Sequence, residues 1–468
     1  MNGMRFGLVG MLVGSIVLFS SGATRSAEES QVVTADDRTA LTLTIYDRGS
    51  ALVEETRRVR LPASGRIVWR DAPKTLDPTS VQLEGPRGLQ VLEERFLYDP
   101  LTHERLLKAA RGGRVDLVVT SQQTGEESRT EAVLLAAEGA PVFQIGEEVH
   151  LGHPGRVVLP RMPGSLVPEP ELLWKLAGPT GEAALTARYL AEGFNWRADY
   201  VLRIDEASLV GTLSGVFAVT NTSGADVRDA SVQLVAGTVG RVKPPIVPLA
   251  RGVRAMAERV AEAPVADLHR YTVEEPVTVA DGRTVRLGFL QADRLRLGRR
   301  YEVRGGWPVL LRPRSEEERL PVAVIWLMAN TSEAGLGRPL PGGTLRVYVA
   351  QDDRPLLFAG EVGLGHTPAG VEEVKLETGL AFDLVAKRRQ TEFQRLGKDL
   401  YESAWRVTIE NHKRVEASVR LVEHIPPQAE IISASHAHER AAADRLVFDM
   451  VVPADKAVEV TYKVRVRR

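Results

Sequence analysis

The sequence predicts an all-β protein: a small N-terminal β domain and a barrel-like segment, followed by β-sandwich units of which the last is immunoglobulin-like. Three observations predict this class. Apolar and polar residues alternate with a period of two in many short stretches, Gly and Pro separate these stretches at short intervals, and few segments carry a helical pattern. Strands joined by turns, without helices between them, pack as sheet on sheet.

The clearest alternating stretch covers residues 457–467. Its apolar residues fall on one face and its charged residues fall mainly on the other, which is the pattern of a half-buried antiparallel strand. The apolar face consists of Val458, Val460, Tyr462, Val464 and Val466. The same alternation predicts strands around residues 41–45, 115–119, 285–289, 345–349 and 405–409.

Two short helices are predicted within this β-rich pattern. Thr102 can cap the first, which covers residues 102–110 and stops at Gly112. The second covers residues 251–263, where Val253, Met256 and Val260 are spaced as on one helical face. We interpret the second helix as part of a loop insertion rather than as a partner-binding or membrane-surface helix.

The balance of charge and the absence of cysteine exclude several classes of protein. The chain has 468 residues, with 60 Lys+Arg against 61 Asp+Glu, so it lacks the basic surface of a nucleic-acid binder and we expect no nucleic-acid partner. Without Cys there are no disulfides, thiolate zinc sites, iron–sulfur clusters or Cys nucleophiles.

The N-terminus has the pattern of a secretory signal peptide. Residues 6–19 form an apolar run without charge, Arg5 precedes it, and the small residues Ser21, Gly22 and Ala23 follow. The run is short for a bilayer span and no later stretch reaches that length, so we expect no transmembrane helix in the mature chain. We therefore expect a periplasmic or secreted protein, exported through this signal peptide.

Composition shifts along the chain suggest five segments. We expect a signal peptide at 1–27, an N-terminal β domain at 28–100, a small β-barrel-like segment at 101–180, a β-sandwich core at 181–381 with a Pro-rich insertion at 241–268, and a C-terminal immunoglobulin-like β-sandwich at 382–468.

A loose repeat of strand, Asn and polar residues occurs three times, at Asn221, Asn330 and Asn411. Asn at the exit of a strand can adopt a left-handed conformation or close a turn through its own side chain. We interpret the three asparagines as turn devices in recurring hairpins.

From about Leu185 onward the chain resembles the bacterial family called domain of unknown function 4139. The resemblance rests on ordered blocks over residues 187–200, 271–290, 341–348, 358–361, 366–370 and 407–426. Larger members, described as mucoidy-inhibitor-like, carry a coiled coil before the domain, and this chain resembles the shorter form without it. The resemblance implies a β-rich secreted protein and supplies no catalytic residues.

Histidine pairs are the candidate metal ligands. His436 and His438 would share one face if they lay on a strand, but no third or fourth ligand has diagnostic spacing, so we interpret the pair as part of a polar turn. His150 and His153 suggest a hairpin turn, and His366 reads as a structural hydrogen-bonding residue.

Charged clusters give no catalytic assignment. Paired acids lie next to each other at Asp36-Asp37, Glu147-Glu148, Asp352-Asp353 and Glu372-Glu373, whereas glycoside hydrolysis needs carboxylates facing each other across a cleft. We interpret the basic residues Lys387, Arg388 and Arg389, and those at 465–468, as solvated strand faces.

One aromatic segment is open to two interpretations. Phe194, Trp196, Ala198 and Tyr200 share strand parity and so line one face, with Arg197, Asp199 and Arg203 on the opposite face toward solvent. We interpret the aromatic face as sandwich core, while a carbohydrate-binding platform is the alternative.

The leading hypothesis is a non-enzymatic exported protein with an interaction or structural role in the cell envelope, bound to an unknown envelope protein or polysaccharide. The alternative is a carbohydrate-active hydrolase or glycan-binding protein of the cell envelope. We assign no catalytic, cofactor-binding or metal-binding residue and expect no cofactor.

Export with removal of the leader is the first testable prediction. We expect intact-mass measurement of periplasmic material to show a mature N-terminus between Thr24 and Glu28. A chain that still begins at Met1 or Met4 and sediments with the inner membrane would contradict it.

Overall fold

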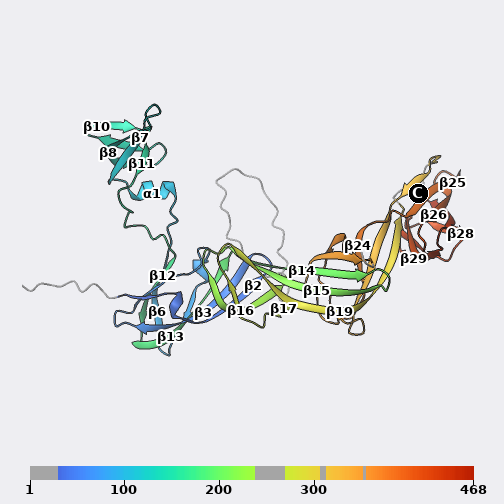
Figure 1. The fold of residues 1–468 in the computed structure, drawn as a ribbon, viewed down its shortest axis with the longest axis horizontal. Helices are drawn as coiled ribbons and strands as arrows, with labels where there is room; N and C mark the ends of the chain where they lie inside the picture. The colour runs from blue at the N-terminus through green and yellow to red at the C-terminus, as the bar shows by residue number, and fades with distance from the viewer. Residues whose placement is uncertain (1–29, 238–268, 306–312, 352–354, 468) are drawn as a thin grey trace, which may run out of the picture. The chain divides into compact units, whose positions relative to one another are not determined.

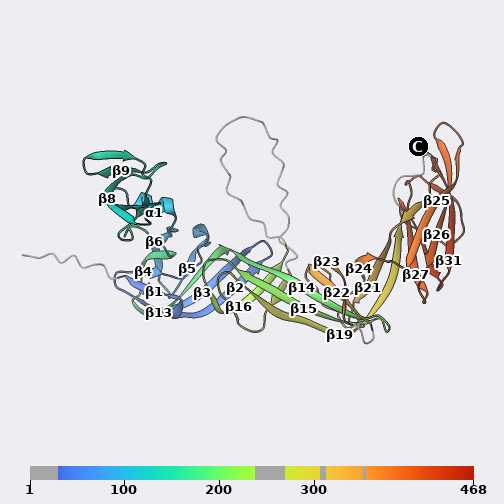
Figure 2. The same ribbon diagram turned by 45° about the horizontal axis from the view of Figure 1, so that its top comes forward.

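A computed structural model describes residues 30–237, 269–305, 313–351 and 355–467 (Figure 1). It confirms that the protein is nearly all-β, with several mixed and antiparallel sheets (Figure 2). In the described residues, one α-helix, α1 (His103–Ala109), and two 3₁₀ helices, η1 (Ala35–Asp37) and η2 (Pro78–Ser80), accompany the strands. The predicted leader at 1–27, the predicted helix at 251–263 and the acidic pair Asp352-Asp353 lie outside the described residues.

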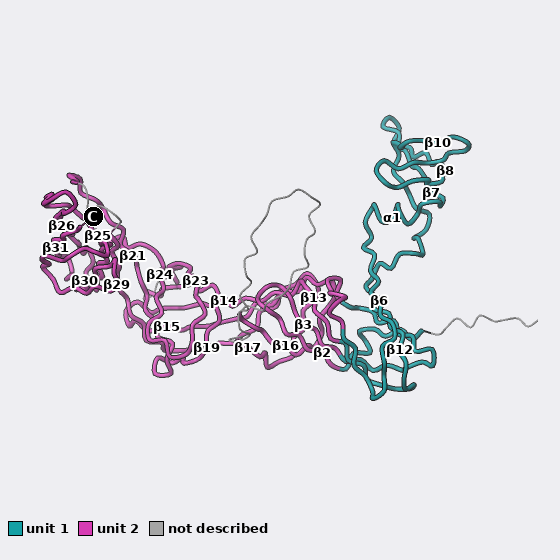
Figure 3. Tube along the Cα trace, turned by 180° about the vertical axis from the view of Figure 1, so that it is seen from behind, with its two compact units in different colours: residues 1–39, 56–72, 82–187 teal, residues 40–55, 73–81, 188–468 magenta. Residues whose placement is uncertain are grey.

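The chain divides into two compact units, each assembled from separate stretches (Figure 3). Unit 1 comprises residues 1–39, 56–72 and 82–187, and unit 2 comprises residues 40–55, 73–81 and 188–468. The five segments expected from composition remain predictions.

The first sheet of unit 1 has the order β1 (Gln31–Val33), β4 (Arg66–Trp69), β12 (Glu171–Ala177), β6 (Gln90–Leu97). Its core contains Trp69 and Trp174, packed edge to face with ring centroids 5.5 Å apart. The buried Arg57 guanidinium lies 4.1 Å from the centroid of the Trp69 ring and donates to the carbonyl oxygens of Val33 and Arg70. A buried cation is thus held by an aromatic face and two backbone acceptors.

The second sheet of unit 1 is antiparallel, in the order β10 (Glu148–Leu151), β9 (Val142–Ile145), β8 (Glu127–Ala136), β7 (Arg114–Thr120), β11 (Arg156–Val158). Helix α1 confirms the first predicted helix, since the Thr102 hydroxyl oxygen accepts from the Arg105 backbone N–H at 3.2 Å. Leu107 of α1 joins the sheet's buried core, which includes Leu117 and Phe143.

A third sheet has the order β17 (His269–Thr272), β16 (Val227–Ala236), β2 (Arg38–Tyr46), β3 (Ser50–Leu61), β13 (Gly181–Glu192), β5 (Gln82–Glu84), with β18 (Val277–Val279) also paired to β16. The alternating residues Leu41, Leu43 and Ile45 of β2 are all buried. The predicted half-buried strand at residues 41–45 is therefore confirmed.

The largest sheet lies in unit 2, in the order β23 (Leu357–Leu364), β22 (Gly343–Ala350), β14 (Phe194–Asp205), β15 (Val210–Asn221), β19 (Arg283–Arg304), β27 (Ala417–His424), β30 (Arg445–Val452), β29 (Glu439–Ala442). β21 (Val322–Asn330) also pairs with β19, and β24 (Val371–Leu380) pairs with β21. β14 and β15 pair along their whole length, from Phe194 opposite Asn221 to Asp205 opposite Val210.

The fifth sheet, also in unit 2, has the order β20 (Glu318–Leu320), β25 (Leu384–Arg395), β26 (Leu400–Asn411), β31 (Ala457–Arg467), β28 (Glu430–Ala434). Its apolar face shares one buried core with β19, β27 and β30, in which Trp405, Tyr462, Leu421 and Phe448 meet. The alternation predicted for residues 457–467 is confirmed, with Val460, Tyr462, Val464 and Val466 buried.

The interpretation of Arg388 as part of a solvated face was wrong. β25 turns Arg388 inward, where its side chain is 3% exposed and lies 2.7 Å from Glu423, which is 1% exposed. Arg388 also pairs with Glu318 at 2.7 Å and lies over the Trp405 ring. Because β25 alternates, its neighbours differ: Arg389 is exposed, and Lys387 pairs with Glu410. The alternation of β25 places Arg388 on the same buried face as Leu384 and Ala386, and Glu423 and Glu318, which are distant in the sequence, pair with its charge there.

The three repeated asparagines end β15, β21 and β26, and all three are buried. The Asn411 amide donates to the carbonyl oxygens of Val415, Val452 and Pro453 at 2.9–3.1 Å. Its own oxygen accepts from the Lys413 backbone N–H at 3.0 Å, which closes a turn through the side chain.

Asn221 repeats this arrangement with Ala225, Val279 and Ser223. The Asn330 amide donates to the carbonyl oxygens of Arg338, Thr367 and Pro368. The prediction that these asparagines close turns is confirmed for Asn221 and Asn411, whose side-chain oxygens accept from the backbone N–H two residues on. It is not borne out for Asn330, whose side-chain oxygen has no hydrogen-bond partner among the described residues.

Replacing the Asn411 amide tests this role. Asn411→Asp removes both N–H donors and places a carboxylate against three carbonyl oxygens, so we expect a loss of at least about 2 kcal/mol in the free energy of unfolding. Asn195→Asp, at an exposed position of β14, is the matched control and should change stability by less than about 0.5 kcal/mol. Urea unfolding at neutral pH measures both, and equal curves for the two variants would contradict the role.

Candidate functional site

Five aromatic side chains of unit 2 gather on β14, β15, β17 and β19. Phe217 and Phe289 are stacked, with ring centroids 3.9 Å apart and an interplanar angle of 12°. Trp196 meets Phe217 edge to face at 5.6 Å, Tyr200 meets Phe289 edge to face at 5.7 Å, and Tyr271 lies 5.7 Å from Phe217. We call these residues, Trp196, Tyr200, Phe217, Tyr271 and Phe289, the aromatic cluster.

A β-bulge places Phe289 in the cluster. Gly215 of β15 pairs with Leu290 and Val216 pairs with Gly288, so Phe289 is an extra residue between the two pairs. A side chain on Gly215 would begin only 2.9 Å from the Phe289 ring. The ring therefore occupies the space above Gly215, and only glycine leaves room for it.

Two residues of the aromatic cluster, Phe217 and Phe289, line an open groove of about 690 Å³. Its lining residues come from β15, from β19 and from the segment that follows β17: Ser214, Gly215, Val216, Phe217, Thr272, Val273, Glu274, Glu275, Leu287, Gly288, Phe289, Leu290 and Gln291. Phe217 is buried, whereas Phe289 is partly exposed and offers ring surface to the groove. We call this site the aromatic groove.

The polar residues of the aromatic groove lie at its exposed rim. Thr272, Glu274, Glu275 and Gln291 are all exposed, and the Val273 backbone N–H donates to the Val232 carbonyl oxygen at 3.0 Å, which ties the segment bearing the two carboxylates to β16. The groove thus combines an apolar floor with acceptors at its edge, as ligand sites commonly do.

Two polar atoms of the aromatic cluster are buried without hydrogen-bond partners among the described residues: the Trp196 Nε1 and the Tyr271 hydroxyl. Burial raises the pKa of Tyr271 to about 12, so its hydroxyl is protonated at neutral pH. Each such donor costs free energy in the folded state. The Nε1 atoms of Trp326 and Trp405, outside the aromatic cluster, are buried in the same way.

The structure refines the interpretation of residues 194–200. Phe194, Ala198 and Tyr200 are buried core residues as predicted, and Trp196 is half-buried within the aromatic cluster. The prediction that Asp199 faces solvent was wrong. Asp199 is 4% exposed, because Arg197 lies 3.3 Å away and Arg346 of β22 lies 3.8 Å away and together they cover its carboxylate.

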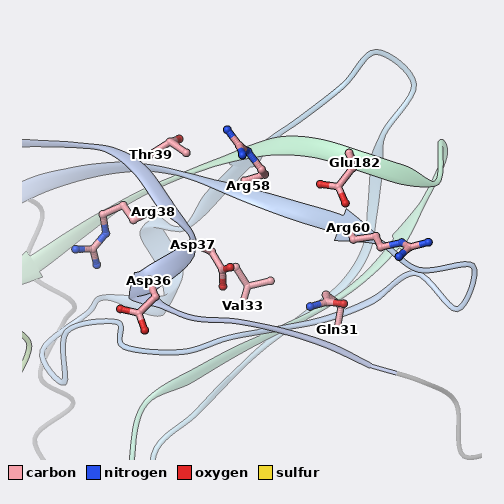
Figure 4. A pocket seen from close by; sticks show the side chains of 9 residues that line it. All are labelled: Gln31, Val33, Asp36, Asp37, Arg38, Thr39, Arg58, Arg60 and Glu182. Carbon is pink, nitrogen blue, oxygen red and sulfur yellow. The ribbon is translucent and has the colours of Figure 1, made fainter.

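Unit 1 holds a second, charged cavity of about 390 Å³ (Figure 4). Three carboxylates and three guanidinium groups line it, from Asp36, Asp37, Glu182, Arg38, Arg58 and Arg60. The Asp37 carboxylate is already used, since it accepts from the Thr34 backbone N–H at 2.8 Å. Opposite charges in equal number leave the cavity without a net charge that would attract an ion.

The histidines singled out in the sequence lie apart from both cavities' lining residues. His436 and His438 lie in the connection between β28 and β29, where the Ser435 hydroxyl is 2.8 Å from His436 Nδ1. His153 Nδ1 accepts from the Gly155 backbone N–H, as a turn residue does. The rings of His366 and His269 lie tilted against each other, with centroids 4.3 Å apart, and partial burial and this neighbour lower the pKa of His366. Within the described ranges, no group of three or more His, Cys, Asp or Glu side chains could hold a metal ion.

Sequence reasoning did not find the aromatic groove as a site. Phe217 and Phe289 fall in predicted strands, and Tyr271 opens one of the blocks of the family resemblance, yet the three positions are far apart along the chain. The one local signal is the spacing of Gly215 and Gly288 within otherwise apolar strands, because glycine inside a strand often marks a bulge or a close approach.

Comparison with known proteins adds no relative: no family model matches the chain, and no curated protein matches it. In the part of the chain that the structure describes, no helix is both long enough and apolar enough to cross a lipid bilayer.

Chelation tests the assignment of the His436 and His438 pair to a turn. Thermal melts with and without EDTA should have the same midpoint, since each ring has a local polar neighbour and no third ligand is placed with it. The double variant His436→Ala/His438→Ala should also have the same melting midpoint with and without EDTA. A lower midpoint on chelation that the double variant abolishes would show that the pair binds a metal.

Proposed function

We propose that this protein is a non-enzymatic exported protein that binds a partner of the cell envelope, a protein or a polysaccharide, through the aromatic groove. The observation that carries the proposal is the partly exposed Phe289 ring, held in place by its 3.9 Å stack on Phe217 and by an edge-to-face contact with Tyr200. A ring fixed before binding loses little conformational entropy when a ligand covers it.

The position of the carboxylates favours binding over hydrolysis. Glycoside hydrolysis uses an acid and a second carboxylate on opposite sides of the scissile bond. Glu274 and Glu275 are the carboxylates that line the groove among the described residues, and they are neighbours on one segment. This placement suits hydrogen bonding to a ligand from one side, so the hydrolase remains the second candidate.

The remaining expectations from the sequence belong to the same proposal. We propose export through the predicted signal peptide to the periplasm or the cell exterior, and kinship with the shorter form of domain of unknown function 4139. We also propose a barrel-like form for residues 101–180 and an immunoglobulin-like form for the C-terminal β-sandwich. The core that the fifth sheet shares with β19, β27 and β30 supports the latter.

Co-sedimentation with insoluble bacterial envelope material tests the proposed function. Wild-type protein should pellet with the material saturably, and Phe289→Ala should weaken this retention by at least about tenfold, because the exposed ring surface is lost. Phe289→Leu keeps apolar volume without a flat face and should weaken it as well.

The matched control is Phe382→Ala, which removes an exposed ring outside the groove's lining and should bind as wild type does. Thermal melts establish that each variant is folded. Equal retention of folded Phe289→Ala and wild type would refute the proposed function.

A further inference from the structure

We infer that the aromatic groove holds a neutral polysaccharide whose sugar rings carry neighbouring free hydroxyl groups, with one ring packed on Phe289. The inference rests on the proposed function of the groove and adds the chemical class of its ligand. Three features of the groove carry it: the geometry of the Phe289 ring, the kind of polar group at the rim, and the sign of the charge there.

The Phe289 ring is a flat apolar surface that lines the groove and is partly exposed. Its stack on the buried Phe217 at 12° and the bulge at Gly215 fix its position. A pyranose ring has a face of C–H groups that carry partial positive charge, which the negative face of an aromatic ring attracts. A flat, fixed ring therefore suits a sugar better than it suits a flexible alkyl chain.

The polar side chains at the rim require hydrogen-bond donors on the ligand. Ionised Glu274 and Glu275 accept only, and Gln291 both accepts and donates. Two adjacent carboxylates can accept from two adjacent hydroxyl groups, and a sugar ring with a vicinal diol supplies such a pair. Ser214 and Thr272 add hydroxyls that can donate or accept in turn.

The charge at the rim excludes acidic polymers. Both charged residues of the groove lining are acids, so a uronic-acid or phosphate polymer would meet like charge. A basic peptide is the other class that two carboxylates attract. The flat ring and the neutral side chains of Ser214, Thr272 and Gln291 favour the uncharged polyol, and the experiment separates the two classes.

The probe is the same envelope material after three treatments: none, periodate, which cleaves carbon–carbon bonds between neighbouring hydroxyl groups, and protease. We expect periodate to abolish the Phe289-dependent retention of the wild-type protein and protease to leave it intact. Retention should change less than about threefold between about 50 and about 500 mM salt, because a neutral ligand makes few ion pairs.

A charge-neutral variant distinguishes a sugar from a basic peptide. Glu274→Gln/Glu275→Gln keeps two acceptors and removes both charges, so retention on a neutral polysaccharide should fall less than about fivefold, whereas retention of a cationic partner should fall more than about tenfold. Glu316→Gln/Glu317→Gln, at exposed positions just before β20, removes the same two negative charges outside the groove's lining and is the matched control for surface charge.

The outcomes separate this inference from the proposed function. If Phe289-dependent retention survives periodate, or if protease removes it, the ligand is not a polysaccharide. The groove would then remain a binding site for another class of ligand. Retention that does not depend on Phe289 would overturn both the polysaccharide inference and the proposed function of the groove. Loss after periodate together with insensitivity to protease and salt supports the inference.

Discussion

Buried backbone carbonyl oxygens at the ends of strands must be hydrogen-bonded, and in unit 2 three asparagine side chains meet this requirement. An all-β chain reverses direction at each strand exit, where the ladder stops and its last acceptors would otherwise be unpaired. Asn221, Asn330 and Asn411 each donate from a buried amide to two or three such oxygens. Since the acceptors of each amide lie on different segments, one side chain ties the end of its strand to neighbouring segments of the fold.

The aromatic groove depends on one irregularity within that regular framework. Perfect pairing of β15 with β19 would place Phe289 opposite a residue of its own, but the bulge leaves it as an extra residue over Gly215. The ring then stacks on Phe217 instead of lying between cross-strand neighbours. A bulge interrupts the ladder and redirects a side chain. In this protein the redirected side chain is the one that offers apolar surface at the groove.

Several features of the fold could be predicted because they are local. Period-two alternation correctly places the apolar faces of β2, β26 and β31, and the Thr102 cap correctly places α1. Buried ionic groups could not be predicted in this way. Arg388 and Asp199 each look like solvent-facing residues beside other charges, yet Glu423 and Arg346, which cover them, come from strands that are distant in the sequence. Burial of a charge is decided by a partner, and the sequence does not identify the partner.

The same distinction between local and long-range features applies to the candidate site. The period-two alternation around Phe217 and Phe289 predicts that both residues lie in strands, and the structure confirms it with β15 and β19. That these two rings stack, that Trp196 and Tyr271 join them, and that Glu274 and Glu275 stand at the rim was decided by the tertiary structure. The order of strands in a sheet and the position of a bulge result from long-range pairing, whose free energy is summed over the whole ladder and cannot be assigned to any short stretch of residues.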